Sequence, residues 1–242
     1  TQVDEANAAI TEINTLRNQF ETASQLVEIR HTIDTRDTFY ETEQGFFDEA
    51  SAIYQGYVSS YYQALTTHPL RNELERTQGK QLFLIAEASL KTFSEEIIPK
   101  LQEENRLSSE YTKLMSSAQI EFDGKTLNLS QFGPYLQSPD RAVRKAASEA
   151  RYGYLKEQGE TIDTIYDKLV RIRTDIAKTL GFPSFVELGY ARMLRVDYNQ
   201  SMVEQYREQI LETIVPLATQ LKERQQRRIG VDHLYYYDEG FA

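Results

Sequence analysis

The chain contains no cysteine and no tryptophan, and it has only three histidines among 242 residues. The absence of cysteine excludes a disulfide framework, a thiol nucleophile, an iron–sulfur cluster and a zinc site built from thiolates. Three histidines leave little room for an all-histidine metal site. Aliphatic and aromatic residues make up 40% of the chain and charged residues 26%, which is the balance of a soluble globular protein.

Basic residues are also in short supply. The chain carries 27 lysines and arginines against 37 aspartates and glutamates, and its pI is near 5.0. Because phosphate contacts need clustered basic side chains, we expect no nucleic-acid partner. The first 50 residues hold eleven acidic and three basic residues. We interpret this acidic region as a solvated helix face, with a partner-facing surface as the alternative.

No hydrophobic run is long enough to suggest a membrane segment. The longest stretch without a charged residue is Ala50–Leu70, and it is interrupted by serine, threonine and glutamine. The first ten residues have neither the basic start nor the apolar core of a secretory signal. We therefore expect a cytoplasmic protein without a membrane partner.

Apolar residues recur three or four positions apart through most of the chain, which predicts helices. We expect a mainly α fold, a helical bundle or array. The expected helices cover residues 4–30, 38–65, 68–79, 82–90, 94–117, 138–158, 162–180, 184–193 and 201–229. The first of the short helices is expected to open at His68-Pro69, and the one beginning near residue 138 to be capped by Ser138.

The period changes at residues 119–129. Apolar and polar residues alternate on both sides of Asp123-Gly124, a dipeptide typical of tight turns, so we expect one small β-hairpin there. This region also marks the only plausible boundary. We predict an N-terminal helical region at 1–117, a hairpin and connector at 118–137, and a second helical region at 138–242.

Pro216 falls inside the last expected helix. Proline removes a backbone hydrogen bond and bends the helix axis. We interpret Pro216 as a kink that follows a curved core, with a functional hinge as the alternative.

The sequence offers no recognisable catalytic or metal-binding motif. Each of His31, His68 and His233 lacks a second histidine three to five residues away, so H-E-x-x-H is absent. The G-x-S-x-G elbow and the glycine-rich phosphate loops are missing as well. Acids are adjacent at 95–96, 103–104 and 238–239, and we expect these pairs on the solvated surface. We therefore assign no catalytic, cofactor-binding or metal-binding residue, although a site assembled from distant residues stays open.

The C-terminal segment VDHLYYYDEGFA is unusually aromatic for a free tail. Tyr235, Tyr236 and Tyr237 are consecutive and cannot all face one side of a helix or strand, and Phe241 follows closely. At least one of these side chains needs another apolar surface. We predict that all four belong to a domain interface and expect that the sequence is cut in mid-structure.

Several segments carry a resemblance to a known family. They are HTIDTRDTFY (His31–Tyr40), the run Leu107–Ala147, GFPSFVELGYARM (Gly181–Met193) and the run Tyr206–Glu239. On these residues the chain resembles the N-terminal part of an oligoendopeptidase F, within the thimet-oligopeptidase-like family of zinc metallopeptidases.

The resemblance implies a parent protein that is a larger, clam-shaped helical peptidase cutting short peptides in a deep channel. It implies one zinc ion, bound by the H-E-x-x-H histidines and a further glutamate, with the motif glutamate as general base. None of these residues maps onto this sequence, since Leu234 follows His233. The chain would then form a channel wall that restricts access by size, would partner its own catalytic domain, and alone would be inactive, zinc-free and able to self-associate.

Two alternatives remain. One is a stand-alone helical scaffold or adaptor that uses its acidic first helices. The other is an inactive paralogue that binds peptides without cutting them. The coding sequence beyond residue 242 separates the three hypotheses, because only the first requires an intact zinc motif there.

Overall fold

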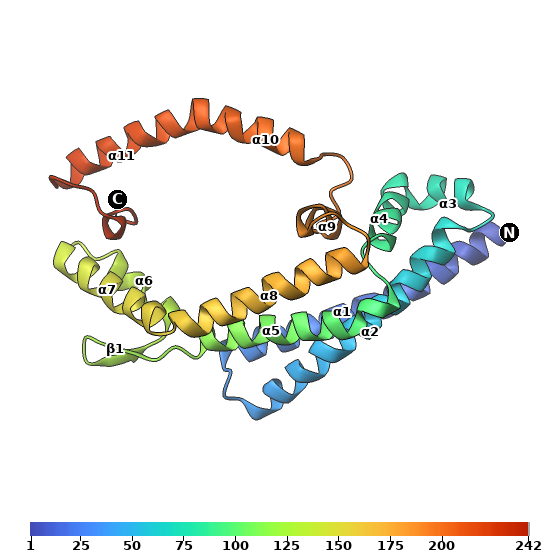
Figure 1. The fold of residues 1–242 in the computed structure, drawn as a ribbon, viewed down its shortest axis with the longest axis horizontal. Coiled ribbons are helices and arrows are strands. Elements are labelled where there is room, and N and C mark those ends of the chain that lie inside the picture. The colour runs from blue at the N-terminus through green and yellow to red at the C-terminus, as the bar shows by residue number, and fades with distance from the viewer. Residues whose placement is uncertain (242) are drawn as a thin grey trace. The chain divides into compact units, whose positions relative to one another are not determined.

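The computed structural model describes residues 1–241, and Ala242, the last residue of the predicted second helical region, lies outside them. Helices make up most of the described chain, and two short strands form one antiparallel hairpin (Figure 1). The predicted mainly α fold with a small β-hairpin is thereby confirmed. No helix in residues 1–241 is long and apolar enough to cross a membrane.

The described chain divides into two compact units, each made from two stretches of sequence. Residues 1–113 and 164–197 form the first, which contains α1 (Gln2–Ile33), α2 (Thr38–Thr66), α3 (Arg71–Gln78), α4 (Lys80–Leu90), α9 (Phe185–Arg192) and most of α5 (Ile98–Ser116) and α8 (Gly159–Thr179). The remaining residues form the second, which contains β1 (Ile120–Phe122), β2 (Lys125–Leu127), α6 (Gly133–Leu136), α7 (Arg141–Glu157), α10 (Gln200–Gln209) and α11 (Val215–Ile229). The three-part division suggested by the sequence stays a prediction.

In the first unit, α1 and α2 pack against each other as an antiparallel pair (Figure 1). The polar segment between them, residues 34–37, turns the chain. Asp37 then caps α2, because its carboxylate accepts hydrogen bonds from the backbone N–H groups of Phe39 and Tyr40.

Two apolar clusters hold the first unit together. Ile10 of α1, Tyr62 and Leu65 of α2, and Phe83 and Ala86 of α4 form one cluster. The other joins α2, α5, α8 and α9 through Ala52, Ile97, Leu101, Ile176, Ala177 and Leu188. Burial of these side chains fixes the helices against one another, at roughly 1.5–3 kcal/mol for each large side chain.

In the second unit, the hairpin pairs Ile120 with Leu127 and Phe122 with Lys125. Asp123 and Gly124 both have positive φ, 53° and 69°, as a two-residue hairpin turn of this kind requires. The strands are too short to be stable alone. They pack their apolar side chains against Phe132 and against Ala147 of α7, which supplies the missing core.

The last long helix is interrupted. A π-helical turn, Ile210–Ile214, separates α10 from α11, and Pro216 lies in the first turn of α11. Figure 1 shows the axis changing direction between the two helices. Gly230 ends α11 in the left-handed conformation, with φ of 69°.

The structure corrects three predicted helix starts. The helix predicted from His68-Pro69 begins at Arg71, because His68 Nδ1 accepts the backbone N–H of Leu70 and holds the preceding residues in a turn. The cap of α7 is Asp140, whose carboxylate accepts the N–H of Ala142, and not Ser138. α8 begins at Gly159, three residues earlier than predicted.

Candidate functional site

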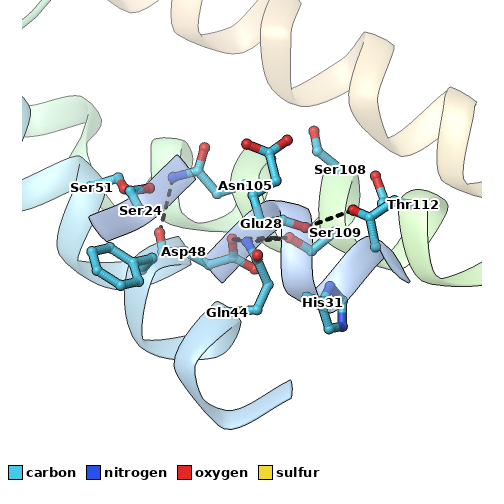
Figure 2. A pocket seen from close by; sticks show the side chains of 12 residues that line it. Ser24, Glu28, His31, Gln44, Asp48, Ser51, Asn105, Ser108, Ser109 and Thr112 are labelled. Atoms are coloured by element: carbon cyan, nitrogen blue, oxygen red, sulfur yellow. Dashed lines mark hydrogen bonds between the residues drawn. The ribbon is translucent and has the colours of Figure 1, made fainter. Parts of the chain in front are cut away.

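A polar groove of about 200 Å³ lies in the first unit between α1, α2 and α5 (Figure 2). Its lining is rich in hydroxyls, amides and carboxylates. The lining residues are Ser24, Glu28, His31, Thr32, Gln44, Phe47, Asp48, Ser51, Asn105, Ser108, Ser109 and Thr112. Such a surface can exchange hydrogen bonds with a polar ligand.

Asp48 of α2 organises the groove. Gln44 Nε2 and Ser109 Oγ each donate to Asp48 Oδ1 at 2.9 Å, and Asn105 Nδ2 donates to the Asp48 backbone carbonyl at 2.9 Å. These bonds tie α2 to α5, and Figure 2 shows the side chains converging from the two helices. Gln44 Oε1 is a buried acceptor that bonds to nothing within residues 1–241.

His31 is buried at one end of this groove. Its Nε2 lies 2.8 Å from Glu41 Oε2, and Lys113 Nζ binds the other oxygen of Glu41. The hydrogen bond from Lys113, assisted by that from His31, lowers the pKa of Glu41 below its usual range. The arrangement joins α1, α2 and α5 through one carboxylate.

Each of the three histidines has a different neighbour. His31 pairs with Glu41, His68 accepts a backbone N–H in the turn before α3, and the ring of His233 lies 4.7 Å from that of Tyr235. No group of three or more potential metal ligands occurs among the described residues. Ser109 and His31 both line the groove, but Ser109 donates to Asp48, so this pair is not arranged as a nucleophile and its base.

Glu104 of α5 is buried, contrary to the prediction that the pair at 103–104 is solvated. Its Oε1 accepts from Arg173 Nε at 2.7 Å and from Arg192 Nη1 at 3.1 Å, and its Oε2 accepts from Arg192 Nη1 at 3.0 Å. Two guanidinium groups from α8 and α9 therefore neutralise one carboxylate. Sequence reasoning missed this cluster because its members are separated by about 70 and 90 residues.

Asp238 corrects the same prediction in the second unit. It is fully buried, and its carboxylate binds Arg141 and Arg144 of α7, each at 2.8 Å. These bonds, that from Arg141 foremost, hold the pKa of Asp238 far below its usual range. Gln225 of α11 also donates to backbone carbonyls of the terminal segment, including that of Phe241 at 2.6 Å.

The aromatic residues predicted for an interface divide into two pairs. Tyr235 and Tyr236 are exposed, whereas Tyr237 and Phe241 are partly buried. Tyr237 stacks on Tyr235, and the guanidinium of Arg144 lies 4.3 Å from the ring centre of Phe241. The segment is therefore anchored within its own unit, and its role at a domain interface stays a prediction.

Two models of protein-family domains match the chain and identify the class of protein to which it belongs. The model of the peptidase M3 N-terminal domain matches residues 1–93, and that of peptidase family M3 matches residues 134–241. The chain belongs to peptidase family M3. No protein of curated function matches it at a significant level.

Several solved structures are similar to this chain over nearly its whole length. A structure assigned as an oligoendopeptidase F from Bacillus anthracis str. Ames is 56% identical, with a TM-score of 0.94 over 99% of this chain. PZ peptidase A with inhibitor 2 is 55% identical, with a TM-score of 0.95 over 98% of this chain. The chain covers 44% and 42% of these two proteins, so it spans less than half their length. The resemblance to the N-terminal portion of an oligoendopeptidase F is confirmed.

Proposed function

We propose that this chain is the N-terminal, channel-wall part of a zinc-dependent oligoendopeptidase that hydrolyses short peptides, and that it restricts access of substrates by size. One observation carries the proposal: the chain matches two oligoendopeptidase F structures at 52% and 56% identity, and it covers only 42% and 44% of their length. The parent is a cytoplasmic enzyme in this proposal. Its other partners are short peptides and the chain's own catalytic domain.

The described residues do not fit a zinc site. Catalytic zinc takes three protein ligands, commonly histidines with a carboxylate, around an open position. Here the buried imidazole of His31 faces Glu41, whose other oxygen binds Lys113. His68 accepts the backbone N–H of Leu70, and the ring of His233 contacts that of Tyr235. We therefore propose that the zinc ligands and the general base belong to the rest of the parent.

Exposed apolar side chains support a role as one part of a larger enzyme. Along α10, the π-helical turn and α11, seven such side chains are 44–65% exposed. They are Met202, Tyr206, Leu211, Ile214, Val215, Leu217 and Leu221. Exposed apolar side chains are unfavourable in water, so in this proposal they pack against the catalytic domain together with Tyr235 and Tyr236.

The test compares the chain with the enzyme it is proposed to complete. The purified 242-residue chain is assayed with quenched-fluorescent peptides of five to fifteen residues, and its zinc content is measured by mass spectrometry. We expect no hydrolysis and no stoichiometric zinc, and we expect activity when the catalytic part of the parent is present. Peptide hydrolysis together with stoichiometric zinc in the chain alone would sink the proposal.

Size restriction is tested separately on the parent. A short peptide and the same peptide fused to a stably folded domain are compared as substrates. Cleavage of the free peptide alone supports the channel-wall role, and equal cleavage of both contradicts it.

A further inference from the structure

Helix α2 carries more apolar surface than the core of the first unit covers. Its buried side chains contact α1, α4 and α5, and they are Phe47, Ala52, Tyr62 and Leu65. Four further apolar side chains of the same helix are exposed, at 61% for Phe39, 60% for Phe46, 47% for Ile53 and 71% for Tyr57. A helix with apolar residues beyond its core face usually has a second partner. We call these four exposed residues the α2 stripe.

The α2 stripe lies along one face of the helix. Phe39, Phe46 and Ile53 are each seven residues apart, which is nearly two full turns, and Tyr57 follows Ile53 by four residues. With a rise of 1.5 Å per residue, the stripe is about 27 Å long. A seven-residue repeat of apolar side chains is the spacing at which one helix packs along another. The stripe therefore has the length and the period of a helix-binding surface.

Neighbouring rings support the two phenylalanines of the stripe. The ring of Phe39 meets that of Tyr40 edge to face, with 5.0 Å between the ring centres. The ring of Phe46 meets that of Phe47 in the same way at 5.3 Å, and Phe47 is itself buried against Phe20 of α1. Aromatic side chains that are already held in place lose little freedom on binding, so they are suited to anchor a partner.

Two glutamates flank the α2 stripe. Glu43 lies four residues after Phe39 and three before Phe46, and Glu49 lies three residues after Phe46 and four before Ile53. Residues three and four apart are neighbours on a helix surface, and the two glutamates are six residues apart, so they lie on opposite sides of the stripe. Neither carboxylate forms an ion pair with another described residue. The sequence of α2 contains no lysine or arginine.

This charge distribution distinguishes between possible partners. In a symmetric dimer through the stripe, the glutamates of one copy would approach those of the other without a basic residue of α2 between them. The first 50 residues add eleven acidic side chains against three basic ones in each copy. Like charges across an interface are unfavourable, whereas opposite charges favour and orient binding. The complementary surface is therefore an apolar helix face with lysine or arginine along both edges.

We propose that the α2 stripe is a docking site for a basic amphipathic helix of another protein. The apolar face of that helix lies along the four stripe residues, and its basic side chains pair with Glu43 and Glu49. A helix of about 18 residues matches the length of the stripe. The acidic first helices thereby acquire the partner-facing role that the sequence left open. The proposal does not depend on the peptidase activity proposed above.

The test uses a synthetic peptide in place of the partner. The peptide is a helix of about 18 residues with leucines on one face, lysines along both edges and one tryptophan among the leucines. Because the chain contains no tryptophan, the indole of the peptide is the only one in the sample, and a blue shift of its emission reports its burial. We expect saturable binding that weakens with added salt. Matched peptides with glutamate in place of lysine, or serine in place of leucine, are expected not to bind.

A first pair of variants tests the apolar anchors. Phe46→Ser with Ile53→Ser removes two exposed side chains of the stripe, so the helical fold is expected to persist, and circular dichroism checks this. Binding of the lysine peptide is expected to weaken by about tenfold or more. The matched control is Leu217→Ser with Leu221→Ser, which removes two exposed side chains from α11 and should leave binding unchanged.

A second pair of variants tests the flanking charges. Glu43→Gln with Glu49→Gln is expected to weaken binding at low salt and to reduce its dependence on salt, because two charge pairs are lost. The matched control is Glu208→Gln with Glu212→Gln, which changes the net charge equally at exposed positions elsewhere in the chain and should have no effect.

The whole parent protein is titrated with the same peptide and is expected to bind it as the chain does. Four results would overturn the proposal. They are the absence of saturable binding, equal binding of the glutamate peptide, unchanged binding in Phe46→Ser with Ile53→Ser, and binding by the chain but not by the parent, which would make the stripe an internal contact of the parent. Sedimentation without peptide adds a fifth, since weaker self-association of the Phe46→Ser, Ile53→Ser variant would identify a second copy as the occupant.

Discussion

At the scale of single residues, two buried carboxylates have the largest consequences. Glu104 and Asp238 are 8% and 0% exposed, and each lies between two arginines. Transfer of a charge from water is costly unless the charge is paired and hydrogen-bonded, and both carboxylates meet that condition. The loss of a carboxylate leaves two arginines without their counter-charge, one of which, Arg144, is almost wholly buried, so these positions are more sensitive than exposed ion pairs.

Asp238→Asn is predicted to destabilise the chain by about 3 kcal/mol, because Arg144 is almost wholly buried and loses its counter-charge. The matched control is Asp167→Asn, which breaks an exposed pair with Arg171 and is expected to cost less than about 1 kcal/mol. Urea unfolding followed by circular dichroism measures both. Equal costs for the two variants would contradict the prediction.

Stability is predicted to fall in acid. The folded chain lowers the pKa of Asp238 and Glu41, whereas an unfolded carboxylate titrates near about 4. The stabilisation is therefore complete above the unfolded pKa, and it is lost as the pH falls toward the folded values. We expect urea midpoints to decline from pH 6 to pH 3, less steeply in Asp238→Asn. An unchanged slope in that variant would count against this assignment.

Neither carboxylate cluster was predictable from the sequence. Adjacent acids on a helix point in different directions, which is why 103–104 and 238–239 resemble solvated pairs. The burial of Glu104 is decided by Arg173 and Arg192, which the chain brings together only on folding. A pattern within one helix carries no information about partners on two others. The polar groove between α1, α2 and α5 depends on the same long-range packing.

At the scale of elements, the segment from Gln200 to Ile229 combines two helices with a π-helical turn. The turn precedes Pro216, whose ring and missing N–H disfavour a regular α-helical hydrogen bond at that point. A π-helical turn inserts one residue per turn and so accommodates the interruption. The π-helical turn and Pro216 thus belong to the same interruption of the helix.

Pro216→Ala is predicted to stabilise this segment by about 1–3 kcal/mol, because a backbone N–H and good helix propensity are restored. Hydrogen exchange of the amides in residues 205–220 is the appropriate measurement, and slower exchange is expected. Gln220→Ala is the control on the same exposed helix, with an expected gain below about 1 kcal/mol. Faster exchange in Pro216→Ala would show that the proline stabilises the helix.

The helices and the hairpin were more predictable from the sequence than the side-chain clusters were. The apolar stripes located the long helices, since periodicity is local in sequence, and the alternation around Asp123-Gly124 located the hairpin. Helix starts were less certain. Ser138, Pro139 and Asp140 are all compatible with a helix beginning, and side-chain geometry selected Asp140.

At the scale of the whole molecule, exposed apolar residues are concentrated along α10 and α11. Every residue from Leu211 to Gln220 is exposed, although six of the ten are aliphatic or proline. A helix with an unpaired apolar stripe is expected to find a partner. In the proposed enzyme that partner is the catalytic domain, and for the purified chain we expect a second copy.

The chain is therefore predicted to self-associate through this helix face. Leu217→Lys with Leu221→Lys places two charges on the stripe, where both leucines are more than half exposed, and should shift the chain toward its monomer mass of 28.1 kDa. Gln220→Lys with Glu223→Gln changes the net charge equally, at exposed positions of α11 on the side away from Val215, Leu217 and Leu221, and should leave association unchanged. Sedimentation equilibrium at about 10–100 μM measures the difference. If the unsubstituted chain is strictly monomeric over this range, its exposed apolar side chains on α10 and α11 do not drive association in water. That result would contradict the proposal that these side chains pack against the catalytic domain.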